Sequence, residues 1–476
     1  MLLQERWGLS FQRFCYLTQF HLSIFMTDQK TVAFYTLGCK MNTYDTQWYG
    51  EQFAEQGYCE VAFGEVADVT VVNTCTVTGQ GDAQSRNALR KAHRVSPEGT
   101  VVAVGCYAQT DPDALAAMPE VDLIVGNAEK TQLMDLLNDT CSMGRTFVTR
   151  SRAKDFDDMN IYNFGSRARA FIKVQEGCNE FCSFCIIPFA RGRSRSRTVD
   201  STVAQVKKLV DVGYGEVVLT GVHIGDYGVD LDGSHLLDVL EAIEQIDGLQ
   251  RFRVSSIEAT FVTDAMIDFF VSSEKFCRHL HVPLQSGDDG VLKAMRRPYT
   301  RTQYIDLIEK LASRIPDMGI GGDVMVGFPG ESDAAFQNTY DLIANHPMTY
   351  LHVFPYSPRG KTPAARMPDQ VDAQVKKQRG AALRALGEEK VSAFQERFFG
   401  ETLPVLFEGR RGNGLLNGLT DNYIRVSVPG PDAACDKIVD VRLDRVEDGL
   451  VMGELVADEF QGEFRPTQEL IQVEHV

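Results

Sequence analysis

The chain has 476 residues, of which 44% are hydrophobic, and its formal net charge is −17 at pH 7. This length predicts about three domains with a sizeable core. The excess of acidic side chains excludes general electrostatic attraction to nucleic acid, so an RNA partner requires a local basic patch. No apolar run is long enough to span a bilayer, which predicts no membrane association. Eleven cysteines without a secretory pattern indicate a reducing, cytoplasmic compartment, where thiols serve as metal ligands rather than disulfides.

The N-terminal third of the chain predicts an α/β domain. Residues 1–29 are aromatic-rich but interrupted by charges, which predicts a disordered extension rather than a signal peptide. Residues 30–140 then alternate between strand and helix patterns, which predicts a parallel, doubly wound sheet. The expected strands are Thr31–Leu37, Val69–Asn73, Thr100–Val104 and Val121–Val125. The expected helices are Tyr44–Gln56, Ala83–Val95 and Asp111–Met118.

Three of these expected strands end in a cysteine, namely Cys39, Cys75 and Cys106. Ligands of open α/β sheets bind outside the carboxyl ends of the strands, so these three thiols are expected to converge on one edge. Three converging thiolates suit an iron–sulfur cluster with one iron left open, because most clusters are closed by four cysteines. The alternative is three inert thiols, since a free cysteine often behaves as a small apolar side chain.

The remainder of the chain predicts two further domains. Residues 141–166 are polar and irregular, which is typical of a linker. Residues 167–370 form a second strand–helix series, which predicts a partial (β/α)6 barrel with its site at the carboxyl ends of the strands. Residues 371–399 predict a helical connector, 400–462 a small β-barrel and 463–476 a tail. The expected strands of the larger barrel are Ala170–Gln175, Glu216–Thr220, Phe252–Ile257, His279–Pro283, Ile320–Val326 and Leu351–Pro355. Those of the small barrel are Leu403–Glu408, Tyr423–Val428, Lys437–Val446 and Leu450–Val456.

A second set of three cysteines follows the first strand of the larger barrel. Cys178, Cys182 and Cys185 have the spacing CxxxCxxC, with the aromatic Phe184 directly before the last of them. Three thiolates at this spacing can hold three corners of a cubic cluster and leave the fourth iron open for a substrate or cofactor. The alternative is a zinc knuckle. Zinc usually takes four ligands in paired CxxC spacing, and no second pair lies nearby.

Polar residues follow several of the barrel strands, at the face where a cofactor is expected. Gly221 ends the second strand and lets the backbone approach a ligand. Ser255, Ser256 and Glu258 end the third strand and are predicted to bind ribose hydroxyls of a cofactor. His223 is interpreted as a side chain that its own loop satisfies. Further polar residues after the fourth and fifth strands are His281, Gln285, Ser286 and Asp323.

Four arginines lie shortly after the CxxxCxxC motif, at Arg191, Arg193, Arg195 and Arg197. Guanidinium groups bind phosphates in bidentate fashion, so this run predicts contact with an RNA backbone. The alternatives are a solvated loop, or a loop whose arginines pair with carboxylates of the same chain.

Taken together, these features resemble the methylthiotransferase family of radical S-adenosylmethionine (SAM) enzymes. The resemblance spans about residues 30–460, and the C-terminal barrel resembles the TRAM domain, which binds RNA in relatives. The motifs that carry it are TLGCKMN (36–42), NTCTVT (73–78), VGC (104–106), EGCNEFCSFCIIPFARGRSRSR (176–197), LTGVHIGDYG (219–228) and FPYSPRGKTPA (354–364).

The resemblance implies two [4Fe-4S] clusters. The cysteines of the CxxxCxxC motif would hold the cluster that binds and reductively cleaves SAM, with Phe184 beside it. Cys39, Cys75 and Cys106 would hold an auxiliary cluster that carries the sulfur to be inserted at C2 of an adenine. The resemblance also implies a flavodoxin-like or ferredoxin-like electron donor and a monomeric enzyme. The sulfur donor stays open.

Residues around the first-domain cysteines indicate the branch of the family. Lys40 follows Cys39, and Thr76-Val77-Thr78 follows Cys75. This pattern resembles the branch that modifies N6-threonylcarbamoyladenosine just 3′ of the tRNA anticodon. The isopentenyladenosine branch tends to have glutamine after the first cysteine, and the branch that modifies a ribosomal aspartate has proline there. Both remain alternatives. A non-catalytic metal- and RNA-binding protein is an alternative of another class.

Overall fold

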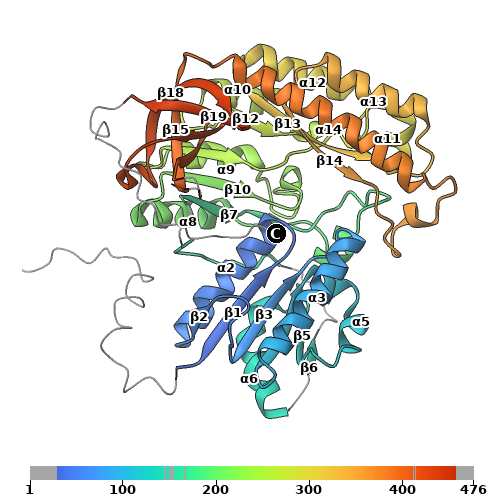
Figure 1. Cartoon of the computed structure of the whole chain (residues 1–476), viewed down its shortest axis with the longest axis vertical. Helices are drawn as coiled ribbons and strands as arrows, with labels where there is room; N and C mark the ends of the chain where they lie inside the picture. Colours follow the sequence, from blue (N-terminus) through green and yellow to red (C-terminus); the bar gives the residue numbers. More distant parts are fainter. Residues whose placement is uncertain are drawn as a thin grey trace, which may run out of the picture.

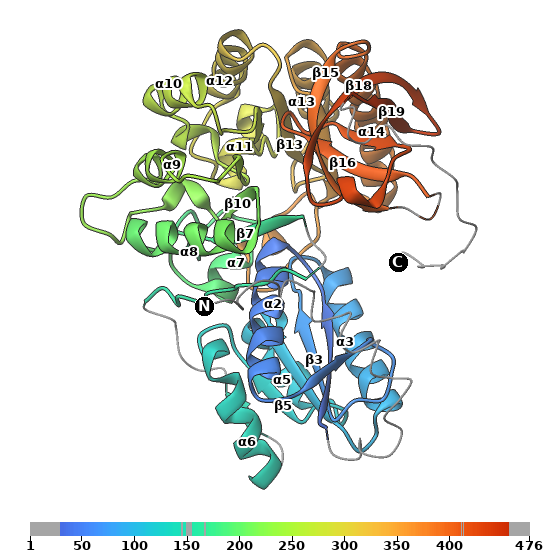
Figure 2. The same ribbon diagram turned by 90° about the vertical axis from the view of Figure 1, so that its left-hand side faces the viewer.

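The computed structural model describes residues 29–143, 146–148, 155–165, 168–410, 412 and 414–456. Within this range the chain forms an N-terminal sheet domain, a central partial barrel and a small C-terminal β-barrel (Figures 1 and 2). The predicted extension up to residue 28 and the predicted tail 463–476 lie outside the described residues.

The N-terminal domain is the parallel α/β sheet that the alternation predicts. Its six strands have the order β2-β1-β3-β4-β5-β6, and every neighbouring pair is parallel. The strands are β1 (Thr31–Thr36), β2 (Cys59–Val61), β3 (Val69–Thr74), β4 (Thr100–Gly105), β5 (Leu123–Val125) and β6 (Thr146–Val148). The helices are α2 (Lys40–Glu55), α3 (Gly79–Val95), α4 (Cys106–Thr110), α5 (Pro112–Ala116) and α6 (Leu133–Met143).

Helices cover both faces of this sheet because each has one apolar stripe. α3 and α5 place Leu89 and Leu115 in the core on one face. α2 and α6 place Phe53 and Leu137 in the core on the other face. The side chain of Thr78 accepts a hydrogen bond from Gly81 N at 3.1 Å and so caps the start of α3, three residues after the cysteine that follows β3.

Several parts of this domain differ from the prediction. The helices α4 and α6 were not expected, and neither was β2. The predicted linker 141–166 contains the end of α6 and the strand β6, which pairs with β5 through Leu123 and Thr146. Both unexpected strands are three-residue edge strands whose pairing depends on backbone hydrogen bonds, so no alternating apolar pattern marks them. Residues 155–165 have no helix or strand, as expected of a linker.

The central domain has the six parallel strands of the predicted partial barrel. They form two three-stranded sheets, β7-β10-β11 and β12-β13-β14. Backbone hydrogen bonds join the sheets, from Cys277 N to Phe252 O and from Ile257 N to His281 O, each 2.9 Å long. The strands are β7 (Arg169–Lys173), β10 (Glu216–Thr220), β11 (Arg251–Val254), β12 (His279–His281), β13 (Gly319–Val326) and β14 (Tyr350–Pro355). The outer helices are α8 (Val199–Val212), α9 (Leu236–Glu244), α10 (Asp264–Ser272), α11 (Asp289–Met295), α12 (Arg301–Arg314) and α13 (Asp333–Asn345).

The C-terminal region consists of one long helix and a closed five-stranded barrel. α14 (Ala373–Glu396) lies within the predicted connector, and the barrel order is β15-β16-β17-β19-β18. The strands are β15 (Thr402–Arg410), β16 (Leu416–Thr420), β17 (Arg425–Val428), β18 (Ile438–Glu447) and β19 (Leu450–Leu455). β16 was not predicted because glycine weakens the strand pattern. Gly418 is needed there, since a Cβ would lie 2.3 Å from Val405 Cγ1 on the paired strand.

Two arginines of β11 fasten this barrel to the central domain. Arg251 and Arg253 share the buried carboxylate of Glu216, at 2.5 Å and 2.7 Å. Their remaining N–H groups donate to carbonyl oxygens of the small barrel, including Leu419 O at 2.9 Å and Thr420 O at 2.6 Å. The two arginines and Glu216 therefore link the central domain to the small barrel and fix the relative position of the two domains.

We expect Arg251→Met to loosen the small barrel. The substitution removes charge-assisted hydrogen bonds and leaves a buried carbonyl without a donor, which costs about 2 kcal/mol of docking free energy. Limited proteolysis should then cut between α14 and β15 faster than in the unchanged protein, with loss of a fragment of barrel size. Arg445→Met is the control, because Arg445 is exposed and its ion pairs among the described residues are with its sequence neighbours Asp444 and Glu447. Equal cleavage of both variants would contradict this role of Arg251.

Candidate active site

A cavity of about 720 Å³ lies where the central domain meets the N-terminal domain. Figure 2 shows the contact, with α2 running up to β7. The cavity wall includes cysteines from both predicted sets, Cys39 from the N-terminal domain and Cys178, Cys182 and Cys185 from the central domain. The three CxxxCxxC thiols and one thiol of the N-terminal set, Cys39, therefore border one chamber.

The CxxxCxxC thiols are free and accept hydrogen bonds from nearby N–H groups. Arg297 Nη1 donates to Cys182 Sγ at 3.1 Å, and Glu180 N donates to Cys178 Sγ at 3.5 Å. Burial raises the pKa of Cys178 and of Cys185 to about 12. Buried thiols that face N–H donors match the surroundings of iron–sulfur ligands, in which such hydrogen bonds tune the cluster.

A glycine holds this cysteine loop close to its neighbour. β8 (Gln175–Glu176) pairs with β9 (Arg195–Ser196), and Gly177 between β8 and Cys178 has a φ of +82°. A Cβ at Gly177 would lie 1.9 Å from Arg193 O, so no other residue type fits there. The loop that carries the first cysteine is thus fixed by close backbone contact.

The other three cysteines lie at the carboxyl edge of the N-terminal sheet. Cys39 precedes α2, Cys75 follows β3, and Cys106 begins α4 directly after β4. The pKa of Cys106 is raised to about 11, mainly by burial and to a smaller extent by the thiols of Cys39 and Cys75, while Arg191 opposes the increase. The structure therefore brings these thiols together, whereas their role as iron ligands stays a prediction.

Small residues keep space open beside these thiols. A Cβ at Gly38 would lie 3.1 Å from Cys75 Sγ, and one at Gly81 would lie 3.5 Å from the same sulfur. Asn127 Nδ2 donates to Cys106 Sγ at 3.8 Å. Free thiols, N–H donors and space beside the sulfurs make a donor set that fits an iron–sulfur cluster.

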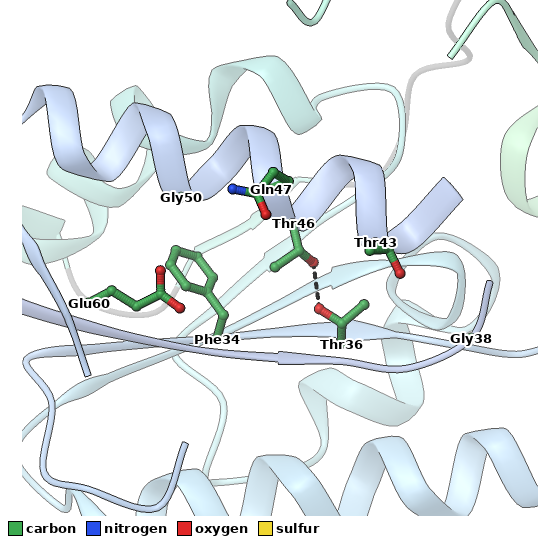
Figure 3. Close-up of a pocket in the computed structure, with 8 residues that line it drawn as sticks. All are labelled: Phe34, Thr36, Gly38, Thr43, Thr46, Gln47, Gly50 and Glu60. Atoms are coloured by element: carbon green, nitrogen blue, oxygen red, sulfur yellow. Dashed lines mark hydrogen bonds between the residues drawn. The ribbon is translucent and has the colours of Figure 1, made fainter. Parts of the chain in front are cut away.

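A hydrogen-bonded pair of threonines anchors the loop of Cys39. A smaller hollow of about 280 Å³ lies between β1 and α2. Figure 3 shows the residues that line it, with Gly38 at one end. Thr36 at the end of β1 and Thr46 in α2 bond across it at 2.8 Å, and Thr46 also accepts from Asn73 Nδ2 at 3.0 Å. These bonds tie the strand end to the helix and so fix the turn that carries Cys39.

The arginine run predicted to bind RNA is mostly buried. Arg191, Arg195 and Arg197 are 3%, 4% and 1% exposed. Arg191 donates to the Glu176 carboxylate at 2.5 Å, and Arg195 donates to backbone carbonyls of its own loop. RNA contact is therefore wrong for these three side chains, because their partners are groups of the same chain. Arg193 is exposed, and its contact with RNA stays a prediction.

All residues predicted to bind a cofactor line the cavity, namely Phe184, Gly221, Ser255, Ser256 and Glu258. The buried hydroxyl of Ser255 has no hydrogen-bond partner among the described residues, which leaves it available to a ligand. Gly221 is also required by packing, since a Cβ there would lie 2.9 Å from Gln175 Oε1. Glu258 already pairs with Arg297, the residue that donates to Cys182.

His223 differs from its prediction. It was expected to be satisfied by its own loop, yet neither ring nitrogen has a hydrogen-bond partner in the part of the chain that the structure describes. The ring lines the cavity and packs edge-on against Phe261. Burial lowers the pKa of His223, so the neutral ring offers one donor and one acceptor to a ligand.

Sequence reasoning named His281 and Asp323 but missed the aromatic and histidine cluster to which they belong on the far wall. His279 stacks on Tyr423 of the small barrel, with ring centroids 4.0 Å apart. Tyr350 Oη lies 2.9 Å from His279 Nε2 and 3.0 Å from His281 Nδ1. His281 Nε2 in turn lies 3.1 Å from the Asp323 carboxylate. These residues come from β12, β13, β14 and the barrel, so no local motif could join them.

Lys40 was noted in the sequence only as a branch marker, but its side chain lines the same cavity. Burial lowers the pKa of Lys40, and the cations Arg169 and Arg253 lower it further. The spacing of a single lysine after a cysteine could not reveal that two arginines of the central domain lie close to it.

Comparison with known proteins identifies the three domains. Residues 172–343 match the radical SAM superfamily, residues 31–126 match uncharacterized protein family UPF0004, and residues 396–456 match the TRAM domain. The Bacillus subtilis threonylcarbamoyladenosine tRNA methylthiotransferase MtaB is 41% identical, over 87% of this chain and 93% of the relative. The enzyme of the same name from Aquifex aeolicus is 40% identical, over 84% and 97%.

The chain belongs to the MtaB-type methylthiotransferase family of radical SAM enzymes. A tRNA-2-methylthio-N(6)-dimethylallyladenosine synthase from Moorella thermoacetica is less similar, at 33% identity over 90% of this chain and 99% of the relative. Membership in the radical SAM superfamily implies a [4Fe-4S] cluster and SAM, and the CxxxCxxC motif lies within the matched residues.

Solved structures agree with the fold of this methylthiotransferase. The radical SAM methyltransferase TsrM from Kitasatospora setae has a TM-score of 0.53 at 16% identity, and the match covers 71% of this chain and 75% of that chain. Among the helices in the described ranges, none is both long and apolar enough to cross a membrane.

Proposed function

We propose that this methylthiotransferase converts N6-threonylcarbamoyladenosine, just 3′ of the tRNA anticodon, into its 2-methylthio derivative. The observation that carries the proposal is the single cavity lined by cysteines of both sets. Its volume of about 720 Å³ lies in the range of pockets that bind small molecules and cofactors. The higher identity to the MtaB relatives, 41% and 40% against 33% for the dimethylallyladenosine synthase, supports the choice of nucleoside.

We infer that the CxxxCxxC cysteines hold the SAM-binding cluster and that Cys39, Cys75 and Cys106 hold a second [4Fe-4S] cluster. When bound, these groups and SAM supply the electron, the sulfur and the methyl group. The protein's own residues position and shield them. Arg297 orients the sulfur of Cys182, and Ser255 offers an unpaired hydroxyl to a ribose.

The small barrel supports a tRNA partner. Tyr423 of the barrel and Lys40 of the N-terminal domain line the same cavity, so a nucleotide that enters it contacts all three domains. The TRAM match covers the barrel and agrees with RNA binding. The electron donor of flavodoxin or ferredoxin type, the monomeric state and the cytoplasmic location stay predictions.

Cysteine substitutions test the assignment of two clusters. After anaerobic reconstitution, we expect Cys178→Ala and Cys39→Ala each to lose roughly half of the iron and sulfide, because each removes a ligand of one cluster only. Methylthiolation should be abolished in both variants. Cys435→Ser is the control, since Cys435 lies in the small barrel outside the cavity. Full iron content in Cys39→Ala would contradict the second cluster, and zinc in place of iron would favour the non-catalytic alternative.

The nucleoside itself is tested in cells. We expect tRNA from a strain that lacks the gene to lose 2-methylthio-N6-threonylcarbamoyladenosine, measured by mass spectrometry of digested tRNA, and a plasmid copy to restore it. Loss of the methylthio group from isopentenyladenosine, or from a ribosomal aspartate, would assign the enzyme to another branch. An unchanged profile would overturn the proposed function.

A further inference from the structure

Lys40 is a cation without a carboxylate partner. Its side chain lines the cavity beside Cys39, yet in the described ranges no acidic side chain lies within ion-pair distance of its ammonium group. The other lysine and arginine side chains on the cavity wall all have such partners. These pairs are Arg169 with Glu408, Arg191 with Glu176, Arg253 with Glu216 and Arg297 with Glu258.

The surroundings of Lys40 are positively charged although the whole chain is acidic. Arg169 and Arg253 are its charged neighbours, and both also approach the carboxylate of Glu216, at 3.9 Å and 2.7 Å. His279 lies near the same group and its pKa is lowered, by burial first and then by these cations. The carboxylates of this corner, Glu216 and Glu408, pair with the arginines, so Lys40 is left without an anionic partner that a bound anion could supply.

Three anions could reach this corner if the proposed function holds, and the inference rests on it. The carboxylate of SAM belongs near the CxxxCxxC cysteines and Ser255, on the central domain. The RNA phosphates lie on the ribose side of the nucleotide, away from the base edge that reacts. The carboxylate of the threonylcarbamoyl group hangs from N6, on the same Watson–Crick edge as C2. When C2 faces the cysteines of the N-terminal sheet, this carboxylate comes beside Cys39 and hence beside Lys40.

We propose that Lys40, supported by Arg169 and Arg253, binds the carboxylate of the threonylcarbamoyl group and so selects this nucleoside. Lys40 is exposed to the cavity, so its ammonium group is open to a ligand, and a neutral N6 substituent such as isopentenyl offers it no ionic partner. The lysine therefore selects by attraction of the acidic substrate.

Two anticodon stem-loop RNAs test this proposal. One carries N6-threonylcarbamoyladenosine, and the other carries the same nucleoside with its carboxylate converted to the primary amide. We expect the unchanged reconstituted enzyme to bind the acid about 10- to 100-fold more tightly than the amide, measured by fluorescence anisotropy. In Lys40→Gln this preference should disappear, with weaker binding of the acid and little change for the amide. Lys40→Arg should retain most of the preference. Lys208→Gln, on the outer helix α8, should bind like the unchanged enzyme.

Iron and sulfide content and single-turnover methylthiolation are measured on the same samples. Equal weakening for acid and amide in Lys40→Gln, with or without loss of iron, would overturn the proposal, because Lys40 would then serve the cluster or the fold. An unchanged enzyme that binds acid and amide equally would overturn it as well. Failure of the proposed function looks different, since neither RNA would be methylthiolated even though the acid still bound more tightly.

Discussion

Glu176→Gln is expected to destabilise the enzyme by about 3–5 kcal/mol, the cost of breaking a buried ion pair from one side. Glu176 is 1% exposed and contacts Lys130 at 2.6 Å and Arg191 at 2.5 Å. Lys173 lies 3.5 Å away. Arg195, 3.8 Å from Glu176, is a fourth cation. The only other carboxylate among the close described contacts of these cations is Asp45, so the substitution leaves four buried cations with one anion.

The midpoint of urea denaturation, followed by intrinsic fluorescence, measures this loss. Glu241→Gln on the exposed side of α9 is the matched control and should leave the midpoint unchanged. A loss below about 1 kcal/mol would contradict a dry network, because that is the value of solvent-exposed pairs. Asp45 and Lys130 belong to the N-terminal domain and Glu176 to the central domain. If urea denaturation shows more than one transition, the transition at the lowest urea concentration should report the separation of these two domains.

The pH dependence of stability should change with the same substitution. Burial alone raises the pKa of Glu176, but Lys130, Lys173 and Arg191 hold it well below its ordinary value. A carboxyl group whose pKa is lower in the folded state contributes stability above the unfolded pKa of about 4.3 and loses it as the pH falls. The unchanged enzyme should therefore lose stability steeply below about pH 4.3, and Glu176→Gln less steeply. Parallel pH profiles would contradict this account.

Gly177→Ala is the second substitution with a large expected effect. Its Cβ would meet Arg193 O at 1.9 Å and Gly192 O at 2.8 Å, and the φ of +82° is itself unfavourable for alanine. The backbone term costs about 1–2 kcal/mol and the overlap about 1–3 kcal/mol, so we expect a loss of about 2–5 kcal/mol. The strand pair β8–β9 must separate to relieve the overlap, which displaces the adjacent Cys178.

Denaturation midpoint and iron content together check this prediction. Gly213→Ala is the control, because Gly213 has a φ of +112° but nothing within 4 Å of its added Cβ. It should lose only the backbone term, about 1–2 kcal/mol, and keep its iron. Gly177→Ala should lose the iron bound by the CxxxCxxC cysteines as well. Full iron content in Gly177→Ala would show that the cysteine loop tolerates the displacement.

The parts of the fold with a strong local pattern could be predicted from sequence. The parallel strands that end in Cys39, Cys75 and Cys106 are short apolar runs between helices, and their common edge follows from parallel pairing alone. The edge strand β6 and the glycine-containing β16 escaped prediction, because pairing with a neighbour rather than local propensity forms them.

The candidate site was predictable only where its residues are contiguous in sequence. The CxxxCxxC motif carries its own spacing, and so do Ser255, Ser256 and Glu258 after one strand. The run of four arginines gave a wrong prediction of RNA contact for three of them, because a sequence does not distinguish a buried guanidinium from an exposed one. Arg191 is buried by Asp45, which lies far away in the chain. The corner formed by Lys40, Arg169 and Arg253 likewise requires two domains to meet before its charge becomes visible.

A buried network of ion pairs joins the N-terminal and central walls of the chamber. Its members are Asp45, Lys130, Lys173, Glu176 and Arg191. Because these buried ion pairs resist separation of the two walls, we expect a single nucleotide, and not a folded anticodon loop, to enter the chamber. The conformational change must then occur in the RNA. The target adenosine then has to flip out of its base stack and enter the chamber as a single nucleotide. The deformability of the anticodon loop around that adenosine therefore contributes to the selection of tRNA substrates.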